Sequence, residues 1–358
     1  MHAAVNAPKS PLPVTILTGF LGSGKTTLIN HLLRQDQNER IAIIENEFGS
    51  VNIDGALIHP QANVEVIELS NGCVCCSIRG ELSAALQGIL AKIDDGALHI
   101  DRLILETTGL ADPGPIIQTF FVDEVLRERL MLDAVITLVD AHHITRQLDE
   151  HRVASAQIGF ADRIILSKTD LIDASEKSHV LSRIHRINSK ATMIEATHGA
   201  LPKESWLNIG AFELDDALQL SQGVYQATAN RPLAPQAADS SANWFNFTPF
   251  TSSTLSQSEQ SWNDDIQSYA FTAGELDLKK IGALMEHLVE THGNDMLRYK
   301  GVLAIAGEPR TLIVQGVHKV VGFDYGAEFR GTRQSLLVII GRYLPYDALK
   351  QAFIQTQA

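Results

Sequence analysis

The sequence predicts an α/β domain with a mainly parallel sheet, followed by a smaller α+β domain. Three observations lead to this fold class. Between residue 13 and about residue 198, short runs rich in Val, Ile and Leu alternate with helix-like segments. Several of these runs are apolar throughout, which is typical of strands covered on both faces. The alternation stops near residue 221, and a different pattern begins near residue 264.

The expected elements of the first domain follow one another as strand, helix and strand. The strands are expected at residues 14–17, 41–45, 64–69, 103–106, 134–140, 164–167 and 193–196. The helices are expected at residues 26–34, 81–93, 115–129 and 176–188. Such alternation places helices on both sides of one sheet, because parallel neighbours need long crossover connections.

The rest of the chain divides into three parts. Residues 1–12 form a tail before the first domain, which spans 13–220. Residues 221–263 are rich in Ser, Ala, Gln, Asn and Pro and nearly uncharged, which indicates a linker or mobile loop. The small α+β domain spans 264–358. Its strands are expected from Tyr269 and near 302–306, 311–317 and 336–340, and its helices near 276–292 and from Tyr346.

The composition argues against several classes of protein. The formal net charge of −13 disfavours a general affinity for nucleic acid or anionic membranes. No apolar run approaches the roughly 20 residues of a membrane-spanning helix, and the first dozen residues lack the apolar core of a secretion signal. All three cysteines lie within four positions, so they cannot form a disulfide framework. We therefore expect a cytoplasmic protein with free thiols.

A phosphate-binding loop follows the first expected strand. The stretch GFLGSGKTT satisfies the pattern G-x-x-x-x-G-K-[ST] with Gly19, Gly24, Lys25 and Thr26. Glycines let main-chain N–H groups curl around phosphate oxygens, and the helix that follows presents its positive end. Lys25 is expected to reach the β- and γ-phosphates and Thr26 to offer its hydroxyl to Mg²⁺. The sequence thus predicts a nucleotide site.

The fourth expected strand ends in a second nucleotide-related motif, in which Gly109 follows Glu106 by three residues. The acid can hold Mg²⁺ through water, and the N–H of Gly109 can approach the γ-phosphate. Leu110 stands where Ras-like enzymes carry a water-orienting Gln, so we expect slow hydrolysis unless Glu45 or Glu47 takes that part. The expected catalytic residues are Lys25, Thr26, Glu106 and Gly109.

The stretch LSKTDL at the end of the sixth expected strand predicts a preference for guanine. Asp170 can accept hydrogen bonds from guanine N1 and N2, and the stem of Lys168 can cover the base. The usual motif is N-K-x-D, and Ser167 stands in place of its Asn. This substitution weakens the match.

The cysteines lie together in the stretch NGCVCC, as Cys73, Cys75 and Cys76. Thiolates favour zinc and other soft or borderline ions, and zinc normally takes four ligands. Three thiolates therefore leave one position open, which suits a site that gives up its metal. A redox pair formed by Cys73 and Cys76, or buried structural thiols, are the alternatives. Glu45, in the stretch ENEFG, is a candidate oxygen ligand, whereas Glu47 fits a solvated loop better.

Taken together, these motifs resemble one family. GFLGSGKTT, ENEFG, NGCVCC, ETTGLADPGPI and SKTD occur in the order found in CobW/YjiA-type P-loop GTPases. The tract RYKGVLAIAGEPRTLIVQGVHKV is similar to the second domain of that family. The resemblance covers nearly the whole chain outside the N-terminal dozen residues and the 221–263 segment.

The resemblance implies a GTPase of metal homeostasis that couples hydrolysis of GTP to transfer of an ion to a client metalloprotein. The ion would be zinc, with cobalt or nickel as alternatives, and Cys73, Cys75, Cys76 and Glu45 would hold it. Asp170 would select guanine. The residues implied to bind GTP or GDP are Gly19, Gly22, Ser23, Gly24, Lys25, Thr26, Thr27, Lys168 and Asp170.

Some residues depart from the family pattern. Residues 221–263 contain no His, whereas many relatives carry a His-rich tract there, and Ser50 replaces a frequent acidic residue. His179 and His198 resemble auxiliary metal-contacting histidines of the family, although exposed histidines that bind metal only in vitro are the favoured interpretation. The same interpretation covers His142, His143 and His318.

The sequence leaves three functional hypotheses. In the first, the γ-phosphate orders residues 45–50 and 106–112 and so opens or closes the thiolate site. In the second, the protein is a GTP-regulated binding module without metal delivery. In the third and least favoured, it is a metabolic kinase. No nucleic-acid or membrane partner is expected, and a homodimer stays open.

Overall fold

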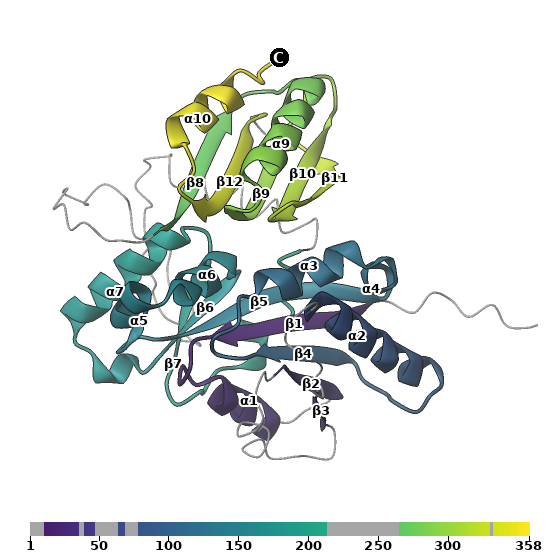
Figure 1. The fold of residues 1–358 in the computed structure, drawn as a ribbon, viewed down its shortest axis with the longest axis vertical. Helices are drawn as coiled ribbons and strands as arrows, with labels where there is room; N and C mark the ends of the chain where they lie inside the picture. The colour runs from purple at the N-terminus through teal and green to yellow at the C-terminus, as the bar shows by residue number, and fades with distance from the viewer. Residues whose placement is uncertain (1–10, 36–38, 47–63, 69–77, 213–264, 330–331) are drawn as a thin grey trace, which may run out of the picture.

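The computed structural model describes residues 11–35, 39–46, 64–68, 78–212, 265–329 and 332–358. They form two domains, one stacked above the other in Figure 1, with a larger sheet in the first domain and a smaller sheet in the second. Within the described residues, no helix is long and apolar enough to cross a membrane. The predicted fold class is confirmed.

The first domain contains a seven-stranded sheet in the order β3-β2-β4-β1-β5-β6-β7, and every neighbouring pair of strands is parallel. The predicted "mainly parallel" sheet is thus wholly parallel among the described residues. Its strands are β1 (Leu12–Gly19), β2 (Ile41–Asn46), β3 (Val64–Glu68), β4 (Arg102–Thr107), β5 (Leu130–Asp140), β6 (Arg163–Ser167) and β7 (Thr192–Ala196).

Helices cover both faces of this sheet, because its strands are apolar on both sides. One face packs against α1 and the segment that contains the fully buried Trp206. The other face packs against the remaining helices of the domain. The helices are α1 (Lys25–Arg34), α2 (Ile78–Asp94), α3 (Gly114–Val122), α4 (Glu124–Arg129), α5 (Ile144–Glu150), α6 (Arg152–Phe160) and α7 (Ala174–Ile187).

Two helical features differ from the expectation. The single helix predicted at 115–129 is two helices, because Asp123 ends α3 and its carboxylate accepts a hydrogen bond from the N–H of Leu126 to begin α4. Helices α5 and α6 had no predicted counterpart. Buried polar side chains such as Gln147, Ser155 and Gln157 interrupt the apolar pattern by which an amphipathic helix is recognised.

The second domain is an antiparallel sheet in the order β11-β10-β9-β12-β8, with two helices that pack on one face. The expectation omitted β11, an edge strand with half-exposed residues and two glycines that lacks a strand-like apolar alternation. The elements are β8 (Ile266–Ala273), α9 (Leu278–His292), β9 (Met296–Ala304), β10 (Arg310–Val317), β11 (Val320–Glu328), β12 (Ser335–Arg342) and α10 (Tyr346–Ile354).

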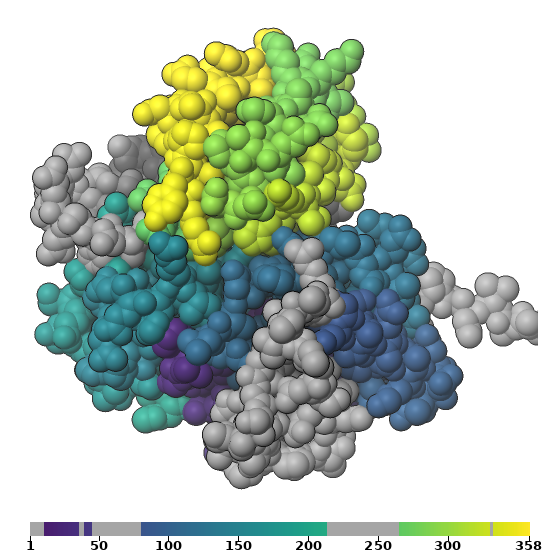
Figure 2. All heavy atoms as spheres, in the orientation of Figure 1, coloured from purple at the N-terminus to yellow at the C-terminus, as the bar shows by residue number. Residues whose placement is uncertain are grey.

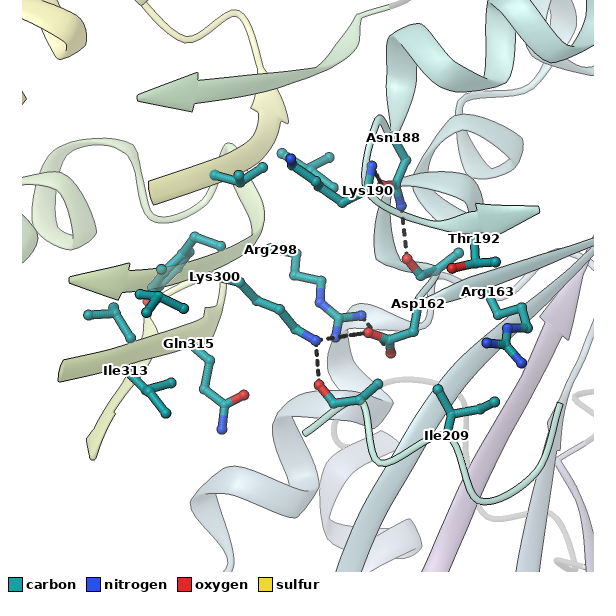
Figure 3. Close-up of a pocket in the computed structure, with 18 of the residues that line it drawn as sticks. Asp162, Arg163, Asn188, Lys190, Thr192, Ile209, Arg298, Lys300, Ile313 and Gln315 are labelled. Atoms are coloured by element: carbon teal, nitrogen blue, oxygen red, sulfur yellow. Dashed lines mark hydrogen bonds and ion pairs between the residues drawn. The ribbon is translucent and has the colours of Figure 1, made fainter. Parts of the chain in front are cut away.

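The two domains are joined by a buried ion-pair cluster around Asp162, which precedes β6. Arg298 of β9 donates hydrogen bonds from both terminal nitrogens to the two carboxylate oxygens of Asp162, and Lys300 Nζ lies 3.0 Å from one of these oxygens. Figure 3 shows both basic side chains reaching from the second domain toward Asp162. In Figure 2 the green and yellow second domain lies directly on the teal part of the first.

A cleft of about 480 Å³ lies beside this ion-pair cluster. Its walls come from the residues before β6 and β7 on one side and from the second sheet on the other (Figure 3). Because these are the amino ends of β6 and β7, the cleft lies at the opposite edge of the first sheet from the phosphate-binding loop.

Candidate functional site

The predicted phosphate-binding loop joins the end of β1 to the start of α1. Its backbone turns through three residues with positive φ, namely Gly19 at 141°, Gly22 at 73° and Gly24 at 104°. Residues with a Cβ rarely adopt such angles, whereas glycine does so readily. No atom would lie within 4 Å of a Cβ placed on Gly22, so this turn borders open space. The loop therefore has the open cradle that a phosphate group requires.

Lys25 and Ser23 point polar atoms at this cradle from within the protein. Lys25 is buried, and its ammonium donates a hydrogen bond to the main-chain oxygen of Gly19 at 2.9 Å. Ser23 is fully buried, and its hydroxyl has no hydrogen-bond partner among the described residues. A buried polar atom without a partner is costly, and a bound polyanion would relieve that cost. The residues present therefore fit a nucleotide phosphate.

The segment after β4 packs directly on the phosphate-binding loop. Glu106 is buried at the end of β4, and the hydroxyl of Thr107 donates a hydrogen bond to that of Thr18 at 2.8 Å. A Cβ on Gly109 would lie 2.6 Å from the main-chain nitrogen of Leu21. Only glycine permits this approach, so the two predicted motifs meet at Gly109.

The predicted base-recognition motif contacts the same loop. The hydroxyl of Ser167 donates a hydrogen bond to the main-chain oxygen of Ser23 at 2.7 Å. Lys168 adopts a left-handed conformation with φ of 55°, and its ammonium donates to the main-chain oxygen of Gly22 at 2.9 Å. Asp170 is exposed in a short 3-10 turn, where its carboxylate is open to a ligand.

The structure adds Asp140, at the end of β5, to the site. Its carboxylate accepts hydrogen bonds from Lys168 Nζ at 2.7 Å and from the main-chain N–H groups of His142 and His143. Burial raises the pKa of Asp140, but the hydrogen bonds and charges of Lys168 and His143 outweigh it and keep that pKa below its ordinary value. Sequence reasoning missed this acid, although an aspartate at the carboxyl end of a parallel strand was an available signal.

The candidate metal site is only partly described. Cys73, Cys75 and Cys76, like Glu47 and Ser50, lie outside the described residues. Glu45 is placed by its backbone in β2, in register with Glu106 of β4 and with Glu68 at the end of β3. The carboxyl ends of these three strands thus meet at the edge that carries the phosphate-binding loop, and the cysteine segment continues the chain from β3.

The histidines do not join a metal cluster in the described part of the chain. His179 on α7 and His198 after β7 are both exposed, and no group of three or more potential metal ligands occurs among the described residues. His142 is exposed, and His143 contacts Asp140. His318 differs from the expected exposed histidine, because it is half-buried between the domains, where its ring contacts that of Phe160.

The fold and the site together define a class of protein. A parallel α/β sheet whose first strand leads into a glycine cradle with a buried lysine is a P-loop nucleotide-binding domain. Residues 13–195 match the CobW/HypB/UreG nucleotide-binding domain, and residues 266–357 match the cobalamin synthesis protein cobW C-terminal domain. The chain belongs to the CobW/HypB/UreG family, which confirms the resemblance seen in its motifs.

Similar proteins are known along nearly the whole length. The zinc chaperone YjiA of Escherichia coli is 38% identical over 346 residues, which cover 96% of this chain and 98% of the relative. The zinc chaperone CobW of Pseudomonas aeruginosa is 30% identical over 376 residues, which cover 94% of this chain and 89% of the relative. The crystal structure of the Zn(II)-bound YjiA GTPase from E. coli matches with a TM-score of 0.73 at 33% identity, over 98% of this chain and all of that chain.

Proposed function

We propose that this protein is a GTP-hydrolysing metallochaperone that binds zinc at Cys73, Cys75 and Cys76 and transfers it to a client metalloprotein. The observation that carries the proposal is that β1 and β3 end at the same edge of the first sheet. The phosphate-binding loop follows β1, and the cysteines follow β3 in the sequence, five to eight residues beyond Glu68. The full-length similarity to proteins named as zinc chaperones supports the choice of metal.

Different residues of the site are proposed to bind different parts of the nucleotide. The backbone from Gly19 to Thr27 surrounds the phosphates, and Lys25 neutralises part of their charge. Mg²⁺ would supply further charge neutralisation on the phosphate oxygens when bound. The Thr26 hydroxyl and the buried Glu106 carboxylate are the oxygen groups suited to hold it. Gly109 packs against the loop, and its N–H is the group that we assign to the γ-phosphate.

Guanine recognition is assigned to Asp170 and Lys168. The exposed carboxylate of Asp170 can accept hydrogen bonds from guanine N1 and N2, which adenine cannot donate in the same pattern. Lys168 is held in place by Gly22 and Asp140, so its stem forms a fixed surface for the base. Ser167 is not assigned to the base, because its hydroxyl donates a hydrogen bond to the main-chain oxygen of Ser23 and so joins the end of β6 to the loop.

Hydrolysis by the isolated protein is expected to be slow. Leu110 follows Gly109, and its side chain is exposed and carries no group that could orient water. Water positioning accounts for a large part of the rate in GTPases. We expect a metal or a docked client to complete the site.

The metal half of the proposal makes a linkage prediction. If GTP changes the affinity for zinc, zinc must change the affinity for GTP by the same factor. Glu45 is the proposed oxygen ligand beside the three thiolates, and cobalt or nickel would suit the same sulfur-rich site. Thiolate binding releases protons, so zinc affinity should rise with pH.

The cellular setting is part of the same proposal. Free thiols at the metal site fit a reducing cytoplasm. The matched regions at 13–195 and 266–357 support our division of the chain into a first domain at 13–220 and a second at 264–358, separated by a 221–263 linker. The proposed partner is a client protein that needs zinc.

The decisive experiment is a stoichiometric zinc titration of the reduced protein against a chromophoric competitor. It is repeated with a GTP analogue, with GDP and without nucleotide. We expect one zinc per chain and an affinity that changes at least severalfold with the nucleotide. The Cys75→Ala variant should lose the zinc and keep GDP binding. Equal zinc affinities in all three states would contradict coupling, and the absence of zinc binding would contradict the metallochaperone itself.

A further inference from the structure

Gln157 of α6 contacts the segment that follows β4. Its side chain is 1% exposed, and its amide nitrogen lies 3.2 Å from the main-chain oxygen of Gly109 and 3.1 Å from that of Ala111. Both hydrogen bonds are accepted by the 109–111 turn, which packs against the phosphate-binding loop. The position of this turn is therefore tied to the position of α6.

The carboxyl end of α6, three residues beyond Gln157, is fixed to the second domain. The main-chain oxygen of Phe160, the last residue of α6, accepts a hydrogen bond from Arg298 of β9. One residue earlier, a Cβ on Gly159 would lie 3.2 to 3.4 Å from side chains of β8, β9 and β12. The side chains concerned are those of Ile266, Leu297 and Ile340. Helix α6 is thus closely packed against the second sheet at Gly159.

The end of the same segment also touches the second domain directly. His318, in the turn between β10 and β11, lies so near Gly114 that an added Cβ would be 2.7 Å from its Nε2 atom. Its ring centroid is 5.5 Å from that of Phe160. Residues 109–114 are therefore held near one end by α6 and at the other by the second domain.

We propose that Gln157 is a positioning residue for GTP hydrolysis, and that its two hydrogen bonds couple the 109–111 turn to the second domain through α6. The proposal rests on the proposed GTPase function. A γ-phosphate that accepts a hydrogen bond from the N–H of Gly109 would shift the main-chain carbonyl groups of Gly109 and Ala111. The bonds to Gln157 then require α6, and the strands packed against it, to follow. A closely packed helix transmits such a shift because it cannot deform continuously.

The test compares Gln157→Glu and Gln157→Met with wild-type protein. Glutamate keeps the size of the side chain but replaces the donor with a second acceptor, and methionine keeps its length without charge. The matched control is Gln351→Glu, the same exchange on the exposed face of α10. The readouts are kcat and KM for GTP, GDP affinity by calorimetry, and amide exchange of residues 296–304 and 335–342 with GDP or a GTP analogue.

We expect both variants of Gln157 to lower kcat by about tenfold to a hundredfold with KM and GDP affinity within twofold of wild type, the scale of a small misplacement of reacting groups. The exchange difference between GDP and GTP-analogue states in the two strands should disappear. The control should match wild type. A merely structural role would weaken GDP binding and lower Tm while preserving that difference.

The failures are distinguishable. If the wild-type protein hydrolyses GTP and Gln157→Met has the same kcat, this inference is wrong and the proposed function stands. That result decides the matter even if Gln157→Glu does not fold. A nucleotide-dependent exchange difference that survives in Gln157→Met overturns the coupling. Absence of GTP turnover in wild-type protein overturns the proposed function, and the inference with it.

Discussion

The hydroxyl of Ser167 donates a hydrogen bond to the main-chain oxygen of Ser23 at 2.7 Å, and this bond joins the end of β6 to the phosphate-binding loop. The two residues are 144 positions apart in the chain. From the motif alone, Ser167 counted as a departure that weakened the case for guanine. In the structure it contacts the loop directly, beside the contact that Lys168 makes with Gly22.

Removing this hydroxyl should weaken nucleotide binding. We expect Ser167→Ala to raise the Kd for GDP by about 2- to 10-fold, because a single hydrogen bond contributes about 0.5–1.5 kcal/mol. Calorimetry at neutral pH measures the change. Ser167→Asn retains a donor and serves as the matched variant, with an expected affinity nearer to wild type. An unchanged Kd in Ser167→Ala would show that the loop keeps its shape without this bond.

Asp170 should determine the choice of base. We expect Asp170→Ala to weaken GDP binding by about 10- to 100-fold, since hydrogen bonds to a charged group contribute about 1.5–3 kcal/mol. Binding of ADP should stay within about twofold, because adenine does not offer the same donors. Competition with a fluorescent nucleotide measures both. Equal losses for the two nucleotides would argue that Asp170 supports the fold of the turn instead of reading the base.

Asp162 should be essential to the contact between the domains. Its side chain is 7% exposed and receives both Arg298 and Lys300. We expect Asp162→Asn to lower the free energy of unfolding by about 3 kcal/mol, because it removes the carboxylate charge beside the buried Arg298 and the partly buried Lys300. Urea unfolding followed by circular dichroism measures this. Glu128→Gln, at an exposed position of α4, is the control and should match wild type.

The contribution of Asp162 should also depend on pH. Burial alone would raise the pKa of this carboxyl, but the charges of Arg298 and Lys300 and the hydrogen bond from Val135 outweigh it and hold the pKa below its ordinary value. A folded-state pKa below the unfolded value of about 3.9 means that the stabilisation is complete above that value. It is lost as pH falls through the folded pKa. The difference between wild type and Asp162→Asn should therefore be largest near pH 7 and shrink below about pH 4.

Two glycines of the second domain should respond oppositely to alanine. A Cβ on Gly316 would overlap the ring of Tyr299, so we expect Gly316→Ala to destabilise the protein by about 1–3 kcal/mol. Gly282 lies within α9 with no atom within 4 Å of an added Cβ, so Gly282→Ala should stabilise it by about 0.5–1 kcal/mol. Thermal unfolding compares the two. A rise in Tm for Gly316→Ala would refute the packing described here.

Much of the fold follows from local patterns. The seven strands of the first domain were predicted from short runs rich in Val, Ile and Leu, several of which are apolar throughout. The phosphate-binding loop and the glycine at 109 were found because their spacing is local. By contrast, the break at Asp123 and the strand β11 were missed. The break between α3 and α4 depends on one capping carboxylate, that of Asp123. Strand β11 was missed because this edge strand has only a weak apolar alternation.

The sequence by itself determined the parallel sheet through the alternation of strand-like and helix-like segments. It determined the glycine cradle with Lys25 and the residues proposed to bind GTP and zinc through short motifs, each of a few consecutive positions. Only the tertiary structure decided the partners of Asp140, Gln157, Asp162 and His318. Gln157 and Gly109 are 48 positions apart, and Asp162 and Arg298 are 136 apart. Contacts at such separations arise when packed elements bring distant backbones together, and a local periodicity carries no information about them.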